Sequence, residues 1–579
     1  MSDGPLIVQS DRTLLLEVDH PRADACRQAV AWFAELERAP EHIHTYRLTP
    51  LGLWNARAAG HTPDDVASSL TDYSKYPVPQ ALLSGVAETM SRYGRLVLES
   101  HPEHGLVLRA LDIAVLEEVL HTTSITSLVG SRVAADLVVV PMSERGRLKQ
   151  ALARAGWPAE DRAHYLSGQV HEMTIHEHDG FALRPYQHEA AAVFWAGGSG
   201  VVVLPCGAGK TLVGAAAMAR AQTQTLILVT NTVAARQWRD ELRRRTSLSA
   251  ADIGEYSGEC KEIRPVTIAT YQVMVARRKG EYAHLELFDA QDWGLVIYDE
   301  VHLLPAPVFR MTADIQSRRR LGLTATLIRE DGREEDVFTL IGPKRYDVPW
   351  RAMEGQGWIA PATCTEVRVT LTETERMAYA TAESEERYRV GASAGSKTDV
   401  VRGLCTKHAD EQILVIGQYV DQLERLAAAL RAPLITGKTT TREREKLYGA
   451  FRCGEVSLLV VSKVANFSID LPDASVAIQV SGTFGSRQEE AQRLGRILRP
   501  KADGRQARFY TLVSRDTNDQ DFAARRQRFL AEQGYAYTIV DGEDVLLPDR
   551  AEQGAPAPIL RLPGVGRERR GRADPVKEA

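Results

Sequence analysis

The sequence has no long apolar run and no leader-like start. No apolar stretch reaches the roughly 18 residues that a membrane-spanning helix needs. Asp3 and Asp11 stand near the N-terminus, where a secretory leader would carry basic residues ahead of an apolar segment. We therefore predict neither secretion nor membrane spanning, and we expect no membrane partner.

Cysteine is scarce. The chain has 6 cysteines, and none of them forms a CxxC pair. Such scattering predicts neither a closed zinc site nor a disulfide framework. We therefore expect a protein of the reducing cytoplasm.

An excess of basic charge is also missing. The net charge is −5, so the composition as a whole does not indicate a nucleic-acid partner, although a local basic channel would be compatible with an acidic remainder. An apolar content of 44% and a charged content of 25% are typical of globular proteins. A length of 579 residues predicts several domains, about three or four.

What is present is a repeated alternation of apolar strands with helices. Short apolar runs bounded by breakers are typical of fully buried parallel strands. They occur first at 201–204, 226–229, 266–268, 295–298 and 321–323, and then at 413–416, 458–461, 477–480 and 509–513. The fold class is therefore predicted as α/β, with parallel-sheet domains at 181–350 and 351–548 that hold a nucleotide at their interface.

Smaller units are predicted before and after the two parallel-sheet domains. Residues 1–110 have the outline of a winged helix, with helices at 24–36, 48–53, 63–70 and 79–90 and a closing hairpin from 95–98 and 106–108. A packing or protein-docking domain is an equally open interpretation. Residues 111–180 are predicted to form a small α/β unit or linker, and 549–579 a basic tail that we expect to be disordered.

A glycine-punctuated turn follows the first apolar strand and leads into a helix. Its residues are Gly207, Ala208, Gly209, Lys210 and Thr211. The glycines let several backbone N–H groups point inward, and the helix N-terminus adds a positive dipole end. Lys210 would reach the β- or γ-phosphate of ATP, and Thr211 would bind Mg²⁺. The turn is therefore predicted to be a phosphate-binding loop, although Leu204 stands where the full pattern has its first glycine.

Two acids follow the strand at 295–298. A carboxylate at the carboxyl end of a parallel strand can reach the Mg²⁺ of a nucleotide on the neighbouring loop, which is the role predicted for Asp299. Glu300 would then orient or deprotonate the attacking water. His302 completes an Asp-Glu-x-His pattern, and we expect it to couple neighbouring motifs rather than to bind a metal.

Several further polar residues have weaker patterns. The amide of Gln187 offers both a donor and an acceptor to an adenine edge, but a surface glutamine is the alternative. Thr230 and Thr270 follow parallel strands, where hydroxyls and backbone N–H groups could hold the phosphates of a DNA strand. Arg496 and Arg499 share one face of a predicted helix and would act as arginine fingers, unless that face is simply solvated.

In their order and context, these motifs resemble those of superfamily 2 helicases. The matching segments are 183–187, 207–211, 299–302, 323–326 (Leu-Thr-Ala-Thr) and 492–499 (Gln-Arg-Leu-Gly-Arg-Ile-Leu-Arg). More narrowly, 204–211, 329–331 (Arg-Glu-Asp) and 462–464 (Ser-Lys-Val) resemble the XPB-type DNA repair helicases, and 5–110 resembles the N-terminal module of their bacterial members. The resemblance covers nearly everything before the tail, and it makes Leu204 a family feature.

The resemblance implies two RecA-like helicase domains, 3′→5′ polarity and, for some relatives, a repair nuclease as partner. It implies a thumb-like insertion, for which 373–394 is the only candidate and is short. It also assigns residues to DNA unwinding (Arg329, Glu330, Asp331), to coupling (Thr324, Thr326, Gln492) and to joint contact with ribose and DNA (Asp470).

We therefore predict a monomeric, ATP- and Mg²⁺-dependent DNA helicase that acts on single-stranded or forked DNA in repair or transcription-linked opening. Two alternatives remain open. One is a duplex translocase that remodels complexes without separating strands. The other is a damage-binding scaffold that uses nucleotide only as a clamp, which the complete set of ATPase motifs disfavours.

Overall fold

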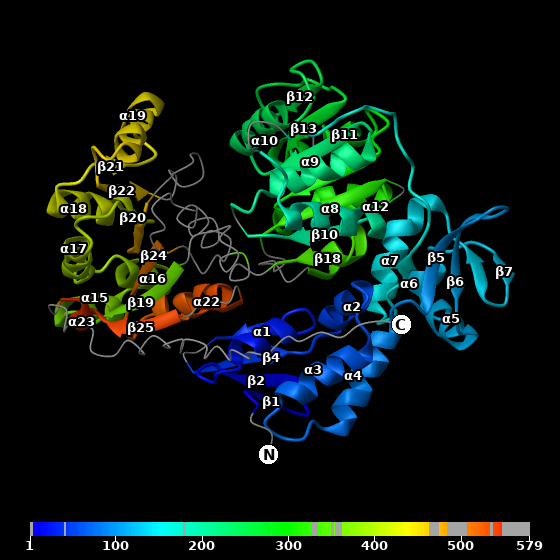
Figure 1. The fold of residues 1–579 in the computed structure, drawn as a ribbon, viewed down its shortest axis with the longest axis horizontal. Coiled ribbons are helices and arrows are strands. Elements are labelled where there is room, and N and C mark those ends of the chain that lie inside the picture. Colours follow the sequence, from blue (N-terminus) through cyan, green and yellow to red (C-terminus); the bar gives the residue numbers. More distant parts are fainter. Residues whose placement is uncertain are drawn as a thin grey trace, which may run out of the picture.

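Two parallel sheets and two smaller N-terminal units make up the fold (Figure 1). The computed structural model describes residues 4–39, 42–177, 181–205, 207–278, 281–316, 318–325, 334–348, 353, 362–462, 474–482, 507–532 and 537–546. Within these ranges no helix is both long and apolar enough to cross a bilayer.

The first large sheet has seven strands, all parallel to their neighbours. Its order is β12 (Ile253–Tyr256), β13 (Val266–Thr270), β11 (Thr225–Val229), β16 (Leu295–Asp299), β17 (Arg319–Thr324), β10 (Gly200–Val203) and β18 (Lys344–Asp347). All five strands predicted here are confirmed. The sequence pattern missed β12 and β18, which lie at the two edges and carry partly exposed residues that break the apolar run.

Helices cover both faces of this sheet (Figure 1). They are α8 (Pro185–Gly197), α9 (Lys210–Ala221), α10 (Thr232–Arg245), α11 (Tyr271–Met274), α12 (Ala306–Asp314) and α13 (Glu334–Asp336), with single turns η2 (Leu285–Phe288), η3 (Val301–Leu303) and η4 (Val337–Ile341). A separate hairpin is formed by β14 (Arg277–Arg278) and β15 (Glu281–Tyr282).

The second large sheet also has seven parallel strands. Its order is β21 (Leu434–Ile435), β22 (Leu458–Ser462), β20 (Ile413–Gly417), β23 (Val476–Gln479), β24 (Ala507–Ser514), β19 (Ala362–Val369) and β25 (Tyr537–Asp541). Its helices are α15 (Glu373–Thr381), α16 (Ser384–Ala392), α17 (Lys397–Lys407), α18 (Val420–Leu430), α19 (Thr441–Arg452), α22 (Asn518–Glu532) and α23 (Gly542–Leu546). The prediction of two parallel-sheet α/β domains is confirmed.

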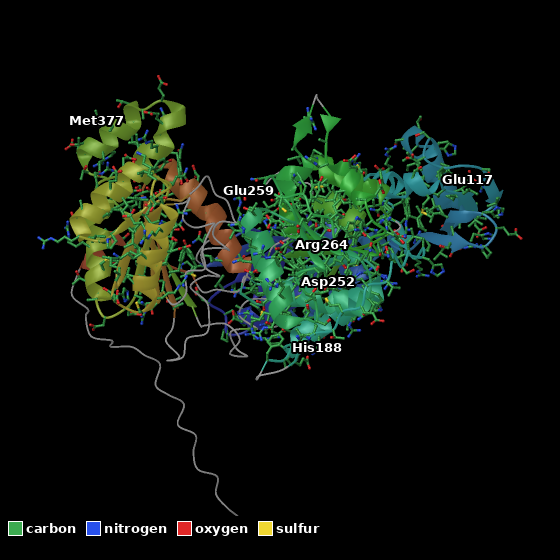
Figure 2. All side chains as sticks on the ribbon, turned by 90° about the horizontal axis from the view of Figure 1, so that it is seen from above. Glu117, His188, Asp252, Glu259, Arg264 and Met377 are labelled. Atoms are coloured by element: carbon green, nitrogen blue, oxygen red, sulfur yellow. The ribbon has the colours of Figure 1, made fainter. Side chains whose placement is uncertain are left out.

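The candidate thumb segment consists of α15 and α16. Tyr388 on α16 is buried and donates a hydrogen bond from its hydroxyl to the Gly482 carbonyl at 2.7 Å, which anchors α16 to the sheet domain. In contrast, α15 has no buried residue, and Met377 on it is 63% exposed (Figure 2). The segment is thus a short pair of helices: α16 is anchored by a buried tyrosine, and α15 is attached by an exposed hydrogen bond from the Tyr379 hydroxyl to Asn518 at 2.9 Å.

The N-terminal unit is built on an antiparallel sheet; the apolar run at 13–18 predicts one of its strands, and the other three were not predicted. Its order is β1 (Leu6–Val8), β2 (Thr13–Glu17), β4 (Ile43–Arg47) and β3 (Glu35–Arg38), and its helices are α1 (Ala23–Val30), α2 (Pro50–Ala58), α3 (Pro63–Tyr73) and α4 (Gln80–Arg92). The helix predicted over 24–36 is wrong beyond Val30. There Leu36 on β3 pairs with Tyr46 on β4, and this long-range pairing overrides the local helical spacing.

The hairpin predicted to close that unit exists, but it belongs to the next one. It comprises β5 (Leu96–His101) and β6 (Gly105–Ala110). These strands sit inside a five-stranded sheet with β7 (Arg132–Ala134), β8 (Leu137–Val139) and β9 (Glu160–Asp161). The unit also holds α5 (Ile113–Leu120), α6 (Thr123–Thr126), η1 (Met142–Glu144) and α7 (Arg145–Arg154). The winged-helix interpretation of 1–110 is therefore wrong, because the hairpin pairs with strands that follow it in the chain.

Both small units pack directly on the first large sheet domain. Asn55 on α2 accepts a hydrogen bond from the backbone N–H of Lys344 at 2.9 Å. On α7, Lys149 is buried and donates to Gln316 at 2.9 Å. Gly146 lies so close to α12 that an added Cβ would be 2.4 Å from the Ala313 carbonyl oxygen. These contacts join the two units and the first sheet domain into one body.

Two deletions test this strand assignment. Removing residues 1–92 leaves every strand of the five-stranded sheet in place, whereas removing 1–110 also takes β5 and β6 from its interior. We expect the shorter deletion to stay soluble and to keep its melting amplitude by circular dichroism, and the longer one, whose remaining strands lose their partners, to lose part of that amplitude or to aggregate. Equal solubility and equal melting amplitudes for both variants would contradict the pairing.

Candidate active site

The predicted phosphate-binding loop joins the carboxyl end of β10 to the N-terminus of α9. Gly207 and Gly209 have φ angles of 82° and 78°, which favour glycine. At Gly209 a Cβ would also lie 2.5 Å from the amide nitrogen of Gln187. Leu204 is fully buried, and its N–H donates to the Thr324 carbonyl at 2.9 Å. Its side chain thus belongs to the core, and its backbone continues the strand pairing of β10 with β17.

The acidic pair, Asp299 and Glu300, lies at the end of β16, which β17 separates from β10, and it faces this loop. The Lys210 ammonium lies 3.0 Å from Oε1 of Glu300, and both side chains are mostly buried, at 11% and 15% exposed. Asp299 accepts hydrogen bonds from the indole N–H of Trp238 at 2.8 Å and from the backbone N–H of Glu300 at 3.1 Å. The parallel order of the sheet thus brings Lys210, Asp299 and Glu300 together at its carboxyl edge.

The two carboxylates have opposite pKa shifts. Burial, together with the neighbouring charge of Glu300, raises the pKa of Asp299 to about 6. Burial acts in the same direction on Glu300, but the charges of Lys210 and His302 outweigh it and hold the pKa of Glu300 below its ordinary value. Glu300 is therefore the carboxylate that stays ionised, while a charge on Asp299 is costly unless a cation lies beside it.

His302 links the acidic pair to the strand that follows. Its Nδ1 lies 2.7 Å from the Thr324 hydroxyl and 3.6 Å from Oε2 of Glu300. Thr324 is fully buried and also accepts the N–H of Leu204 on its carbonyl. Glu300 itself has a φ of 50°, a conformation that a non-glycine residue adopts only where its surroundings hold it. The side chains of Glu300, His302 and Thr324 thus connect the acidic pair to β17, whose backbone pairs with β10 ahead of the phosphate loop.

Gln187 is placed differently from the prediction. It is 1% exposed, its amide nitrogen donates to the Ala208 carbonyl at 2.9 Å, and its amide oxygen accepts from the backbone N–H of Arg184. The Tyr186 hydroxyl donates to the same Ala208 carbonyl at 2.7 Å. The Gln187 amide therefore fixes the conformation of the phosphate-binding loop. An adenine edge could bind it only by replacing its hydrogen bonds to Ala208 and Arg184.

The two threonines proposed to contact DNA differ in exposure. Thr230 is partly exposed and its hydroxyl accepts from Asn231 at 3.3 Å. Thr270 is 2% exposed, and its hydroxyl caps α11 by accepting from the N–H of Val273. The side chain of Thr270 is thus buried and caps a helix, and its contact with a phosphate stays a prediction.

Sequence reasoning missed the aromatic residues around Asp299. Trp238 is the only aromatic residue of α10, an otherwise arginine-rich helix, and that isolation was a usable signal. The hydroxyl of Tyr271 donates to the backbone carbonyl of Asp299 at 2.9 Å. Several predicted residues lie outside the described residues: Thr326, Arg329, Glu330, Asp331, Asp470, Gln492, Arg496 and Arg499.

Replacing Thr324 with valine tests the His302 link. The substitution keeps the volume but removes the hydroxyl, so we expect a cost of about 1–3 kcal/mol in stability and a reduced response of nucleotide turnover to nucleic acid. Thr312→Val is the matched control, because Thr312 is equally buried and its hydroxyl lies 3.0 Å from that of Tyr298, away from the acidic pair. If both variants respond to nucleic acid like the wild type, the link has no coupling role.

Comparisons with known proteins give consistent matches along the chain. The family described as ERCC3/RAD25/XPB C-terminal helicase matches residues 353–552. The family described as type III restriction enzyme, res subunit, matches 180–329, and that described as helicase conserved C-terminal domain matches 6–134.

Whole-length relatives are similar as well. The DNA 3′-5′ helicase XPB of Kineococcus radiotolerans is 70% identical over 545 residues, which are 94% of this chain and 98% of the relative. The protein of the same name from Mycobacterium tuberculosis is 68% identical, over 95% of this chain and 100% of the relative. The general transcription and DNA repair factor IIH helicase/translocase subunit XPB/SSL2 of Saccharomyces cerevisiae is 30% identical, over 92% of this chain and 72% of the relative.

Proposed function

Because the chain belongs to the XPB family of helicases, we propose that it is an ATP-dependent DNA helicase that moves along DNA and separates its strands. The observation that carries the proposal is the cluster of Lys210, Asp299 and Glu300 at the carboxyl edge of the first parallel sheet. The second parallel sheet in the same chain would form the second helicase domain, which such an enzyme needs to close on ATP.

ATP would bind with its phosphates on the loop at 207–211. The backbone N–H groups of the loop and the N-terminus of α9 favour anions, and Lys210 adds a mobile charge. A phosphate there competes with Glu300 for the Lys210 ammonium. Glu300 would then accept a proton from the attacking water, because loss of the Lys210 contact removes the main charge that holds its pKa low and makes it a stronger base.

Mg²⁺ fits the donors that the site offers. Asp299 is a buried carboxylate whose charge calls for a cation, and Thr211 lies in the first turn of α9 beside the loop. We propose that these two residues hold the ion. When bound, Mg²⁺ would offset charge on the phosphate oxygens.

The remaining assignments concern the second domain and DNA. We propose that Arg496 and Arg499 act on the γ-phosphate, that Asp470 and Gln492 join nucleotide to DNA, and that Thr326 shares the coupling role of Thr324. DNA would contact Thr230 and the segment Arg329, Glu330 and Asp331. We further propose 3′→5′ polarity, action as a cytoplasmic monomer in DNA repair, and a repair nuclease as partner.

Strand displacement from a forked duplex tests the proposal. A labelled 3′-tailed fork should lose its strand only when ATP and Mg²⁺ are present, and a 5′-tailed fork should not. If the protein leaves the forked duplex intact but displaces the third strand from a separate triplex substrate, it would instead be a duplex translocase. DNA binding without DNA-stimulated ATP hydrolysis would contradict both motors and favour the damage-binding scaffold.

A further inference from the structure

A cavity lies at the amino ends of the strands of the first sheet, whereas the phosphate loop follows a carboxyl end. Its volume is about 900 Å³, within the range of ligand-binding pockets. It is lined where three units meet, by the ends of α2 and α4, by the segment after β9, and by the amino ends of β17 and β18. Arg319 in the cavity begins β17, and Thr324 beside His302 ends the same strand. The cavity is therefore separate from the ATP site.

Arginine dominates the charge of this cavity. The arginines that line it are Arg57, Arg95, Arg162, Arg319 and Arg345, against the two carboxylates Glu160 and Asp161. Glu160 is paired with Arg162 at 2.8 Å, and Asp161 is paired with Arg145 and Lys149 beneath the cavity at 2.6 and 3.0 Å. In the described part of the chain, the other four lining arginines make no ion pair.

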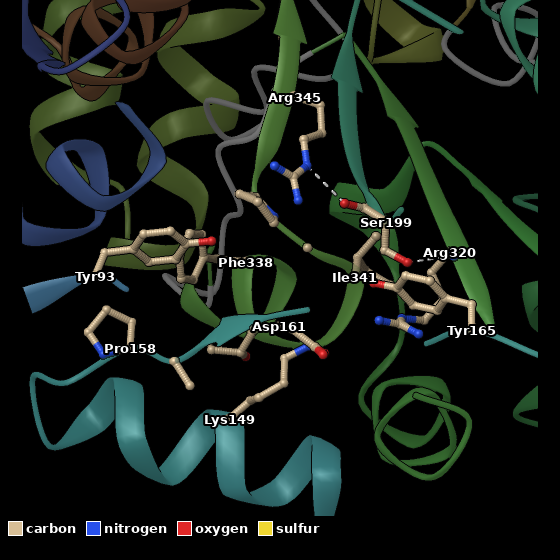
Figure 3. Close-up of a pocket in the computed structure, with 14 residues that line it drawn as sticks. Tyr93, Lys149, Pro158, Asp161, Tyr165, Ser199, Arg320, Phe338, Ile341 and Arg345 are labelled. Atoms are coloured by element: carbon tan, nitrogen blue, oxygen red, sulfur yellow. Dashed lines mark hydrogen bonds and ion pairs between the residues drawn. The ribbon is translucent and has the colours of Figure 1, made fainter. Parts of the chain in front are cut away.

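Two of these four arginines are held rigidly by backbone carbonyls. Arg345 donates to the Ser199 carbonyl at 3.0 Å, a contact drawn in Figure 3 from the side of a smaller neighbouring pocket, and to the carbonyls of Ala58 at 3.2 Å and Gly197 at 2.9 Å. Arg319 donates to the Trp195 carbonyl at 3.3 Å, and burial lowers its pKa. Neutral carbonyl dipoles orient a guanidinium but leave its charge uncompensated, so an anion in the cavity would find positioned cations.

Aromatic side chains accompany the arginines. The Arg319 guanidinium lies 4.0 Å from the ring centroid of Trp195 and 5.2 Å from that of Tyr165. Tyr93 lines the cavity on the side of the N-terminal unit. Alternating guanidinium and aromatic faces are the surfaces on which nucleobases stack, and arginine is the side chain suited to phosphate.

We propose that this cavity binds the phosphate of a nucleotide-sized ligand, supplied either by a free nucleotide or by the phosphorylated end of a DNA strand. The ligand would contact all three units at once and so stabilise their arrangement. This inference goes beyond the helicase activity proposed above and does not depend on it, since no residue of the ATP site lines the cavity.

Arg57 and Arg95 are the residues to change. Arg57 is exposed, and Arg95 makes only a 3.3 Å hydrogen bond to Ser91 and a distant contact with the Trp157 ring, so neither holds the fold as Arg345 does. Arg57→Glu/Arg95→Glu reverses both charges, and Arg57→Gln/Arg95→Gln removes them if the reversal disturbs folding. Arg442→Glu on α19 is the matched control, an exposed arginine outside the cavity.

Fluorescence anisotropy of the full-length protein would use a labelled trithymidylate with a 5′-phosphate and its unphosphorylated twin as probes. We expect the wild type to prefer the phosphorylated probe, and both double variants to bind it at least about tenfold more weakly, with unchanged basal ATP hydrolysis. Arg442→Glu should bind like the wild type. Displacement of the probe by thymidine monophosphate would identify a free nucleotide as sufficient ligand; resistance to it would identify the strand end.

Equal affinity of the double variants and the wild type would overturn the proposal. So would an equal loss in Arg442→Glu, or no preference for the 5′-phosphate. Strand displacement from the forked duplex is measured separately. Failure of the phosphate-binding test would therefore leave the helicase proposal intact, and failure of strand displacement would leave the phosphate-binding proposal intact.

Discussion

Replacing Glu300 with glutamine is expected to slow ATP hydrolysis at least about a hundredfold while ATP binding stays close to that of the wild type. Glutamine keeps the size of the side chain and the backbone N–H bond to Asp299, but it cannot accept the proton of the attacking water. It also removes the negative charge that pairs with Lys210, so the ammonium is not diverted from phosphate. The loss should therefore fall on kcat rather than on affinity.

Fluorescent-nucleotide titration beside steady-state turnover would separate the two effects. Glu259→Gln is the matched control, since Glu259 lies in the same domain and is 78% exposed (Figure 2). Lys210→Ala should show the opposite pattern from Glu300→Gln, with weakened binding as well as lost turnover. Turnover in Glu300→Gln within about threefold of the wild type would leave Glu300 a structural role only.

Replacing Arg499 with lysine is expected to be nearly as damaging, although the charge is kept. Arginine fingers contribute about 10³–10⁵ in rate by stabilising charge that develops on the transferring phosphoryl group. Lysine cannot reproduce the planar fork of a guanidinium. Since the interaction forms mainly in the transition state, we expect near-normal ATP affinity and DNA-stimulated hydrolysis at least about a hundredfold slower. Arg496→Lys should behave alike, because the two residues are three apart in the chain.

Arg442→Lys, at an exposed position of the same domain, is the control for this exchange. Hydrolysis should be measured with and without forked DNA, since the proposed fingers would act when the second domain closes on the nucleotide. A normal kcat in both Arg496→Lys and Arg499→Lys would show that these arginines are surface charge.

The sequence by itself determined the parts of this protein that contiguous residues encode. Buried parallel strands are continuous apolar runs, so nine of the fourteen strands in the two large sheets could be placed from sequence. The phosphate loop and the acidic pair could be placed too, because glycines with positive φ and acids at a strand end are local features.

Only the tertiary structure decided which distant segments meet. The sequence of the β5–β6 hairpin does not indicate which unit it joins. Its pairing with β8 and β9 shows that it belongs to the five-stranded sheet. Gln187 is buried against Ala208 because α8 packs beside the loop, which spacing alone cannot show. The cavity collects arginines from residues 57 to 345, and no window of sequence contains them together. Local conformation follows local sequence, whereas long-range pairing depends on which buried surfaces fit.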